Sequence, residues 1–274
     1  MRRFPDEEHH LAEDRGKKIG MALSIDLNAD IGESPERLAD GSDAELMRYI
    51  TSANIACGGH AGNALTMEQT LELARQNNVA VGAHPSYPDR NNFGRIALNI
   101  PLADLQNSIA DQVSELVAVA RRLKTTIVNV KPHGALYHSC NRDAEIARAL
   151  GRAVLAINPR MIVVGQAGSA CLSIYQHLGL RTAAEAFADR AYEPDGSLRN
   201  RNLAGAVLDS PECAAAQAVS LGTQGRVLAT SGAELTISAN TLCVHSDTPG
   251  SAAVARAVRE RLAAAGVAVR ALRD

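Results

Sequence analysis

The feature that most constrains the fold of this sequence is a regular alternation of short β-branched runs with longer amphipathic segments. Strands and helices in strict succession predict parallel strands that are joined by crossover helices. The expected strands are residues 23–27, 53–57, 79–83, 127–131, 161–165, 182–188, 241–245 and 267–271. The expected helices are residues 65–77, 103–123, 144–156, 169–178, 211–221 and 251–264.

Local signals and chain length indicate how these elements are organised. Leu65, Met67 and Leu71 recur at helical spacing, and Pro211 suits the first turn of a helix. The 274 residues are enough for one large core, and many α/β barrels of this length form a single domain. We therefore expect residues 21–274 to form one irregular (β/α) barrel of seven to eight strands.

Two segments depart from the alternation of strand and helix. Residues 226–239 alternate polar and apolar side chains around Ser231-Gly232, which predicts an inserted β-hairpin. Residues 1–20 are rich in charge and lack the apolar stretch of a secretory signal. We expect them to form a mobile extension in which His9 and His10 have no functional role.

Composition argues against several classes of function. The net charge of −2 shows no basic excess for nucleic acid, and 3% aromatic residues offer few platforms for stacking bases. No stretch approaches the ~18 apolar residues of a membrane span. The five cysteines are scattered and include no C-x-x-C pair, which is typical of reduced thiols in a cytoplasmic protein.

Polar residues gather where the expected strands end. The carboxyl ends of parallel barrel strands open onto one face, so side chains from six strands would meet there. This convergence predicts an enzymatic site at one mouth of the barrel. Its candidates are Asp26, Asn28, Asp30, Glu33, Asn54, His60, His84, Lys131, His133, Tyr137, Asp189, Arg190, His245 and Asp247.

Each candidate also has a purely structural interpretation. A histidine at a strand end is commonly a hydrogen-bonded structural residue, although five of the eight histidines fall in these loops. Asp26 can be a buried acceptor inside the strand, whereas Asp30 and Glu33 are expected in a loop beyond it. Lys131 ends an apolar strand, so its amine either forms a salt bridge inside the barrel or binds substrate.

Two further residues have open roles. Cys57 and His60 could form a nucleophile pair, but an unpaired cysteine is more commonly a small buried hydrophobe. Arg95 follows Phe93-Gly94 and could hold a carboxylate with two hydrogen bonds, or it could be solvated.

A divalent metal ion is another open question. Aspartate and histidine from different strands can assemble a site with nitrogen and oxygen ligands, and Asp30, His60 and His84 are the set to test. No H-E-x-x-H spacing marks such a site. The same groups can act without metal as acids and bases, because histidine titrates near ~6.5.

Several longer motifs, in order along the chain, resemble the LamB/YcsF family, whose members are A subunits of ATP-dependent 5-oxoprolinases. The matching segments are SIDLNADIGES (24–34), YITSANIACG (49–58), HAG (60–62), GAHPSYPD (82–89), FGR (93–95), KPHGALY (131–137), FADRAY (187–192), CVH (243–245) and DTPG (247–250).

The resemblance implies a glycoside hydrolase/deacetylase-like barrel that works with separate B and C subunits. It implies that the assembled complex uses ATP to open the lactam of 5-oxo-L-proline to L-glutamate. This chain has no G-x-x-x-x-G-K-[ST] phosphate loop. We therefore hypothesise that a partner subunit performs much of the nucleotide chemistry.

The resemblance also suggests roles for the candidates. Arg95 or Lys131 would pair with the substrate carboxylate. A carboxylate with a histidine would activate water and protonate the departing nitrogen, and this catalytic set is Asp30, His60, His84, His133 and Asp189. The other substrate-binding candidates are Asn28, Glu33, Asn54, Tyr137, Arg190, His245 and Asp247.

The sequence departs from the usual family pattern near the expected pocket. The altered positions are Pro35, Gly59, Asn63, His138 and Ser246. Two alternatives to the lactam reaction therefore remain open. One is a metal-dependent deacylase or carbohydrate-active hydrolase on the same barrel, which a stoichiometric divalent ion would favour. The other is a diverged binding subunit without turnover of its own.

Overall fold

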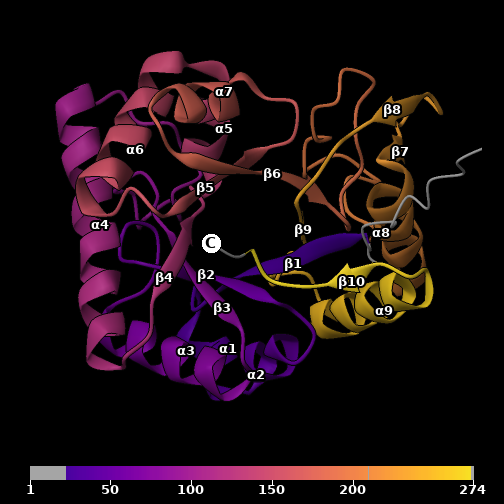
Figure 1. The fold of residues 1–274 in the computed structure, drawn as a ribbon, viewed down its shortest axis with the longest axis horizontal. Coiled ribbons are helices and arrows are strands. Elements are labelled where there is room, and N and C mark those ends of the chain that lie inside the picture. The colour runs from indigo at the N-terminus through magenta and orange to yellow at the C-terminus, as the bar shows by residue number, and fades with distance from the viewer. Residues whose placement is uncertain (1–22, 209, 273–274) are drawn as a thin grey trace, which may run out of the picture.

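A closed ring of parallel strands forms the centre of the protein (Figure 1). The computed structural model describes residues 23–208 and 210–272, so the predicted extension at residues 1–20 lies outside the described residues. Strand β9 pairs with both β6 and β1, which closes the ring, and β10 (Ala268–Val269) adds to the start of β1. The predicted barrel is therefore confirmed. Its ring strands are β1 (Ser24–Ile31), β2 (Ser52–Ala56), β3 (Ala80–His84), β4 (Ile127–Val130), β5 (Ile162–Gln166), β6 (Arg181–Phe187) and β9 (Thr241–Cys243).

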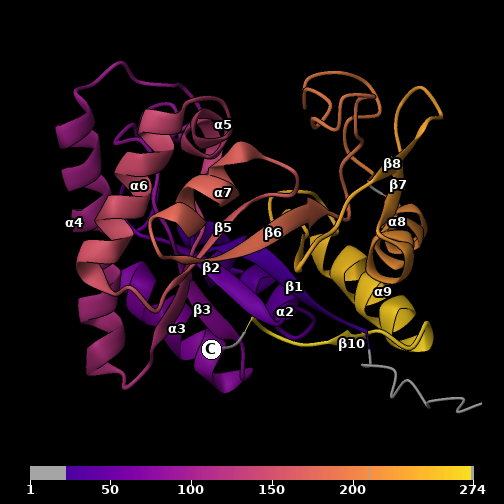
Figure 2. The same cartoon turned by 45° about the horizontal axis from the view of Figure 1, so that its top comes forward.

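Helices form an outer layer around this ring (Figures 1 and 2). Helix α4 packs against α6, and α8 packs against α9. The prediction missed three short helices, α1, α2 and α5, because each is too brief to show a helical apolar period. The helices are α1 (Pro35–Ala39), α2 (Ser42–Met47), α3 (Ala64–Gln76), α4 (Leu102–Arg122), α5 (Gly134–Arg142), α6 (Ala144–Ile157), α7 (Ala170–His177), α8 (Pro211–Gln224) and α9 (Ser251–Ala264).

Polar and apolar side chains alternate along β1, and the polar ones face the inside of the ring. Leu27 and Ala29 on β1 are fully buried in the apolar core, whereas Asp26 and Asn28 form hydrogen bonds with side chains from other strands. Successive side chains of a strand point to opposite faces, so these polar residues share one face. The expectation that Asp30 lies in a loop is wrong, because β1 extends to Ile31 through this polar alternation.

Two connections leave the barrel pattern. The predicted hairpin is confirmed as β7 (Arg226–Leu228) and β8 (Glu234–Thr236), which pair antiparallel. A long connection between β6 and α8 was not predicted, and its backbone makes the bridges Arg190–Val207 and Tyr192–Leu198. Within the described residues, no helix combines the length and apolarity needed to cross a membrane.

Two of the atypical positions have local structural roles. Pro35 is the first residue of α1, directly after the N-cap Ser34, where a missing backbone N–H is harmless. Asn63 caps α3 by accepting hydrogen bonds from the backbone of Leu65 and Thr66. Thr66 accepts in return from the backbone N–H of Asn63, which completes a capping box.

Candidate active site

Three histidines and two carboxylates meet at the carboxyl ends of β1 to β4. His84 ends β3, His133 precedes α5, and His60 lies in the loop after β2. His60 Nε2 lies 2.9 Å and His133 Nδ1 lies 3.1 Å from Glu33 Oε1. His84 Nε2 lies 3.2 Å from Asp30 Oδ2 and 3.0 Å from His133 Nδ1. Sequence reasoning had placed all five among its candidates, and the structure brings them together.

The orientation of two rings is fixed from behind by backbone carbonyls. His84 Nδ1 donates to the carbonyl of Lys131 at 2.7 Å, and His133 Nε2 donates to the carbonyl of Phe93 at 3.0 Å. Carbonyl oxygens only accept, so these two nitrogens carry protons. In the neutral rings, His84 Nε2 and His133 Nδ1 therefore present lone pairs to the centre of the cluster.

The loop that supplies the Phe93 carbonyl depends on a glycine. Gly94 has a φ of +62°, and a Cβ there would lie 3.0 to 3.1 Å from atoms of His60, Ser86 and His133. Only glycine fits both the left-handed backbone and the close approach. The FGR motif is thus required to hold the backbone against His133.

Lys131 connects this cluster to the floor of the barrel. Its Nζ lies 3.0 Å from Asp30 Oδ1, 2.9 Å from Glu185 Oε1 and 3.2 Å from Asn28 Oδ1. The salt bridge inside the barrel is the alternative that the structure favours. Asn54 extends the network by donating to Asp30 at 3.0 Å.

Glu185 is the member of this network that sequence reasoning missed. It is fully buried on β6 and accepts from Lys131 and from Asn28. Its signal was a charged side chain among the small apolar residues that end β6, much as Lys131 is a charged side chain at the end of an apolar strand. The Tyr137 hydroxyl is buried beside this carboxylate, and burial together with Glu185 raises the pKa of Tyr137 well above its usual value.

Charges in the network shift the ionisation of its members. Burial alone would raise the pKa of Asp30, but attraction to His84 and Lys131 holds that pKa well below its usual value. Burial would lower the pKa of Lys131, but its acidic neighbours, Asp30 foremost, hold it well above the usual value. Both groups are therefore charged at neutral pH.

Burial and neighbouring charges shift the pKa values of His60, His84 and Cys57 in different directions. Burial lowers the pKa of His60 to about 4, so this ring is neutral at pH 7. Burial also opposes protonation of His84, but the carboxylate of Asp30 outweighs it and raises the pKa. Burial raises the pKa of the Cys57 thiol to about 12, which argues against a thiolate nucleophile beside His60.

Asp189 pairs with His245 rather than with the three-histidine cluster. It accepts from the backbone N–H of His245 at 2.8 Å and from the ring Nδ1 at 2.9 Å. The ring of His245 stacks on Phe187, and Lys131 Nζ lies 5.9 Å from the centre of the same Phe187 ring. An aspartate that fixes a histidine tautomer is a common arrangement for an acid–base histidine.

The three charged candidates in outer loops have other partners. Arg190 donates to the carbonyls of Ala206 and Arg199, and therefore holds the long connection together. Arg95 is half exposed and lies 3.2 Å from Asp247. Both terminal nitrogens of Arg201 donate to the Asp247 carboxylate, at 2.8 and 2.5 Å. Arg201 was not among the residues predicted from the sequence.

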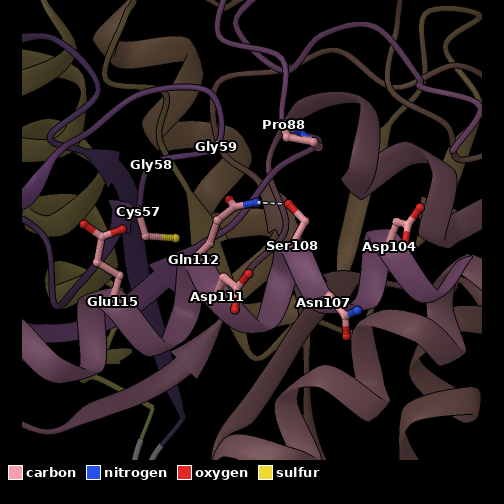
Figure 3. A pocket seen from close by; sticks show the side chains of 10 residues that line it. All are labelled: Cys57, Gly58, Gly59, Pro88, Asp104, Asn107, Ser108, Asp111, Gln112 and Glu115. Carbon is pink, nitrogen blue, oxygen red and sulfur yellow. Dashed lines mark hydrogen bonds between the residues drawn. The ribbon is translucent and has the colours of Figure 1, made fainter. Parts of the chain in front are cut away.

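A surface cavity of about 430 Å³ lies apart from this cluster, on the flank of α4 (Figure 3). Its wall includes Gly59, one of the atypical positions, and Gln112 of α4. The Gln112 amide accepts from the backbone N–H of Ser86 and donates to the Ser86 carbonyl. A Cβ at Gly59 would lie 2.3 Å from Gln112 Oε1, so the glutamine fills the space that a side chain would need.

The remaining two atypical positions flank the mouth. His138 is exposed on α5 beside Tyr137, and Ser246 is buried between His245 and Asp247. Neither is part of the histidine cluster.

Comparison with known proteins places this geometry in a family. The LamB/YcsF family model matches residues 25–274. The chain belongs to the LamB/YcsF family. It is 46% identical to the A subunit of 5-oxoprolinase from Chloroflexus aggregans over 248 residues, which cover 90% of this chain and 98% of that protein. It is 42% identical to the protein of the same name from Pyrococcus furiosus, over 90% of this chain and 97% of that one.

A solved structure agrees with these sequence matches. The lactam utilization protein from Thermus thermophilus is 40% identical and superimposes with a TM-score of 0.86, covering 91% of this chain and all of that one. The LamB/YcsF resemblance predicted from the motifs is thus confirmed along nearly the whole chain.

Proposed function

We propose that this LamB/YcsF chain is the A subunit of a 5-oxoprolinase, which opens the lactam of 5-oxo-L-proline to L-glutamate. The names of its relatives from Chloroflexus and Pyrococcus support the reaction. The observation that carries the proposal is the continuous network from Glu185 through Lys131 and Asp30 to His84 and His133 at one mouth of the barrel.

The chemistry of a lactam explains why such a network is useful. Opening the ring requires stabilisation of the carbonyl oxygen, deprotonation of water and protonation of the leaving nitrogen. Lys131 supplies positive charge beside the cluster. The carboxylates Asp30 and Glu33 can accept a proton, and the side chains of both keep contact with solvent at 17% and 11% exposure. His245, oriented by Asp189, can exchange a proton with the nitrogen.

Recognition of the substrate's carboxylate is assigned to a cation at the mouth. Lys131 is already neutralised by two carboxylates, so Arg95 is the better partner for the substrate. Its guanidinium is half exposed, lies over the Phe93 ring and contacts Asp247 through one nitrogen. Release of that contact would free Arg95 to hold a carboxylate with two hydrogen bonds.

Partner subunits B and C and the use of ATP complete the proposal. A lactam is a stable amide, and ATP can activate it by phosphorylation of the carbonyl oxygen. Since the sequence has no P-loop, we assign that step to the assembled complex and the opening of the activated ring to this chain.

Reconstitution tests the proposal. The purified chain is mixed with B and C subunits, 5-oxoproline and ATP, and glutamate is measured with each component omitted in turn. We expect glutamate only when the chain, both partners and ATP are all present. Binding of 5-oxoproline without any glutamate would instead support the diverged binding subunit, and the proposal would be wrong.

A second function has one observation in its favour. Glu33 and the three histidines have the composition of a metal centre, which suits a metal-dependent deacylase on the same barrel. The sequence led us to expect that a divalent ion would favour this class, but because a lactam is itself an amide, a bound metal alone does not separate the two reactions. Hydrolysis of N-acetylated sugars or amino acids by the isolated chain without ATP would favour this second function.

A further inference from the structure

We propose that Glu33, His60, His84 and His133 form a binding site for one divalent transition-metal ion. Their candidate ligand atoms all lie within 4.8 Å of one another, and all three imidazole rings are buried. The inference shares side chains with the proposed lactam reaction, but metal binding is measured without 5-oxoproline, ATP or partner subunits, so the two can fail separately.

The first argument is that lone pairs meet without a proton between them. The outer nitrogens of His84 and His133 donate to the Lys131 and Phe93 carbonyls, so their inner nitrogens are acceptors in the neutral rings. These two inner nitrogens face each other at 3.0 Å. His133 Nδ1 also faces the acceptor Oε1 of Glu33 at 3.1 Å. A cation among these atoms converts the repulsion into attraction.

The second argument is the distance between the ligand atoms. With metal–ligand bonds of about 2.1 Å, neighbouring ligands lie about 3.0 Å apart at right angles and about 3.4 Å apart at the tetrahedral angle. The separations of His84 Nε2, His133 Nδ1 and Glu33 Oε1 are 3.0, 3.1 and 3.7 Å. The three atoms are therefore already close to the spacing that one ion requires.

The third argument is the way the rings are held. A metal-binding histidine characteristically donates its other N–H to a carbonyl or carboxylate, which fixes the tautomer. His84 and His133 both do so through backbone carbonyls. His60 stacks in parallel on His133 with ring centres 3.7 Å apart and brings its Nε2 to the same Glu33 oxygen.

The fourth argument is the balance of charge. Asp30, Glu33 and Glu185 bring three carboxylates into one network, and Lys131 is the ammonium group that contacts two of them. Two negative charges are left over, which one divalent cation would balance. Imidazole and carboxylate ligands together suit zinc, iron, manganese, cobalt or nickel.

Metal binding by the full-length chain tests the site directly. Because His9 and His10 are adjacent in the sequence, the parent protein carries His9→Ala and His10→Ala and no affinity tag of histidines. After treatment with a chelator it is titrated with Zn²⁺ by calorimetry and with Co²⁺ by visible spectroscopy. We expect about one ion per chain, and a cobalt spectrum of nitrogen and oxygen coordination.

Variants locate the ion. His84→Asn and Glu33→Gln each remove one ligand with little change of volume, and we expect them to weaken Zn²⁺ binding by more than the ~100-fold that loss of an outer hydrogen bond can cost. The matched control is His245→Asn, a mouth histidine outside the cluster, which should bind Zn²⁺ as the parent does. The melting temperature of each variant without metal shows that it is folded.

Two results would overturn the site. The first is a parent protein that binds neither Zn²⁺ nor Co²⁺ stoichiometrically, in which case a proton on His84 holds the cluster together. The second is unchanged Zn²⁺ affinity in folded His84→Asn and Glu33→Gln proteins, which would place the ion elsewhere.

Discussion

Lys131 shows how the contribution of one residue to the stability of the fold depends on its partners. Its ammonium group is buried, and both of its carboxylate partners, Asp30 and Glu185, have little or no contact with water. Removal of one partner from a buried ion pair typically costs about 3–5 kcal/mol, because a charge remains without compensation. The lysine is thus structurally necessary whatever its role in binding.

Lys131→Met should lower the free energy of unfolding by about 3–5 kcal/mol at pH 7, measured by urea denaturation. The double variant Lys131→Met/Glu185→Gln should recover part of that loss, because one of the two uncompensated carboxylates is gone. Equal stability of the single variant and the wild type would show that the ion pair is not formed.

Asp189 makes stability depend on pH in a defined direction. Burial would raise its pKa, but His245 and its hydrogen bonds lower it below the ordinary value of 3.8. A lowered folded pKa stabilises the protein above the unfolded pKa, and this gain is lost as the pH falls through the folded pKa. Asp189→Asn should therefore be less stable than the wild type at pH 7, with a difference that shrinks below about pH 4. Urea denaturation at several pH values measures it, and a constant difference would contradict the pairing.

Residues differed in how well sequence reasoning found them. Asp30, His60, His84 and His133 were found because they lie at or near the carboxyl ends of strands, where a parallel barrel brings side chains together. Glu185 was missed because it lies inside a strand whose apolar residues suggested a purely structural role. Its burial is explained only by the polar interior of the ring. Arg201 was missed because nothing in a loop sequence indicates which carboxylate an arginine will meet.

Among the elements, the loop after β2 is fitted against α4. Gly59 leaves no room for a side chain, because Gln112 and Ser86 occupy the position. Gly59 directly precedes His60, so its contact with Gln112 places the loop that carries His60 against α4.

Gly59→Ala should destabilise the protein by about 1–3 kcal/mol through overpacking, measured as a loss of unfolding free energy. The same substitution should cost less in a Gln112→Ala background, where the clashing amide is absent. Equal costs in the two backgrounds would mean that the glutamine is not what excludes the side chain.

Element boundaries were predicted well where the apolar period was long and poorly elsewhere. α4 was placed within one residue at each end because its apolar residues recur over 21 residues. β1 was predicted too short because its interior face carries Asp26, Asn28 and Asp30. The β6–α8 connection could not be predicted, since Arg190 holds it through backbone carbonyls that no sequence pattern records.

At the scale of the whole molecule, the barrel brings groups from distant parts of the chain to one mouth. Closure of the ring by β9 on β1 sets Asp30, near the start of the fold, beside the strand that leads to His245. The parallel order of strands was predictable from the alternation of elements. The hydrogen-bond partners at the mouth were not, because they depend on the twist and register of the ring.

The central claim is that this mouth opens the lactam of 5-oxoproline. The most direct measurement is ATP-dependent glutamate release by the complex reconstituted with Asp30→Ala or His133→Ala, beside His177→Ala on the exposed end of α7 as control. We expect each mouth variant to lose at least ~100-fold in kcat, the scale of acid–base catalysis, with the control unchanged. Full turnover by both folded mouth variants would contradict the account.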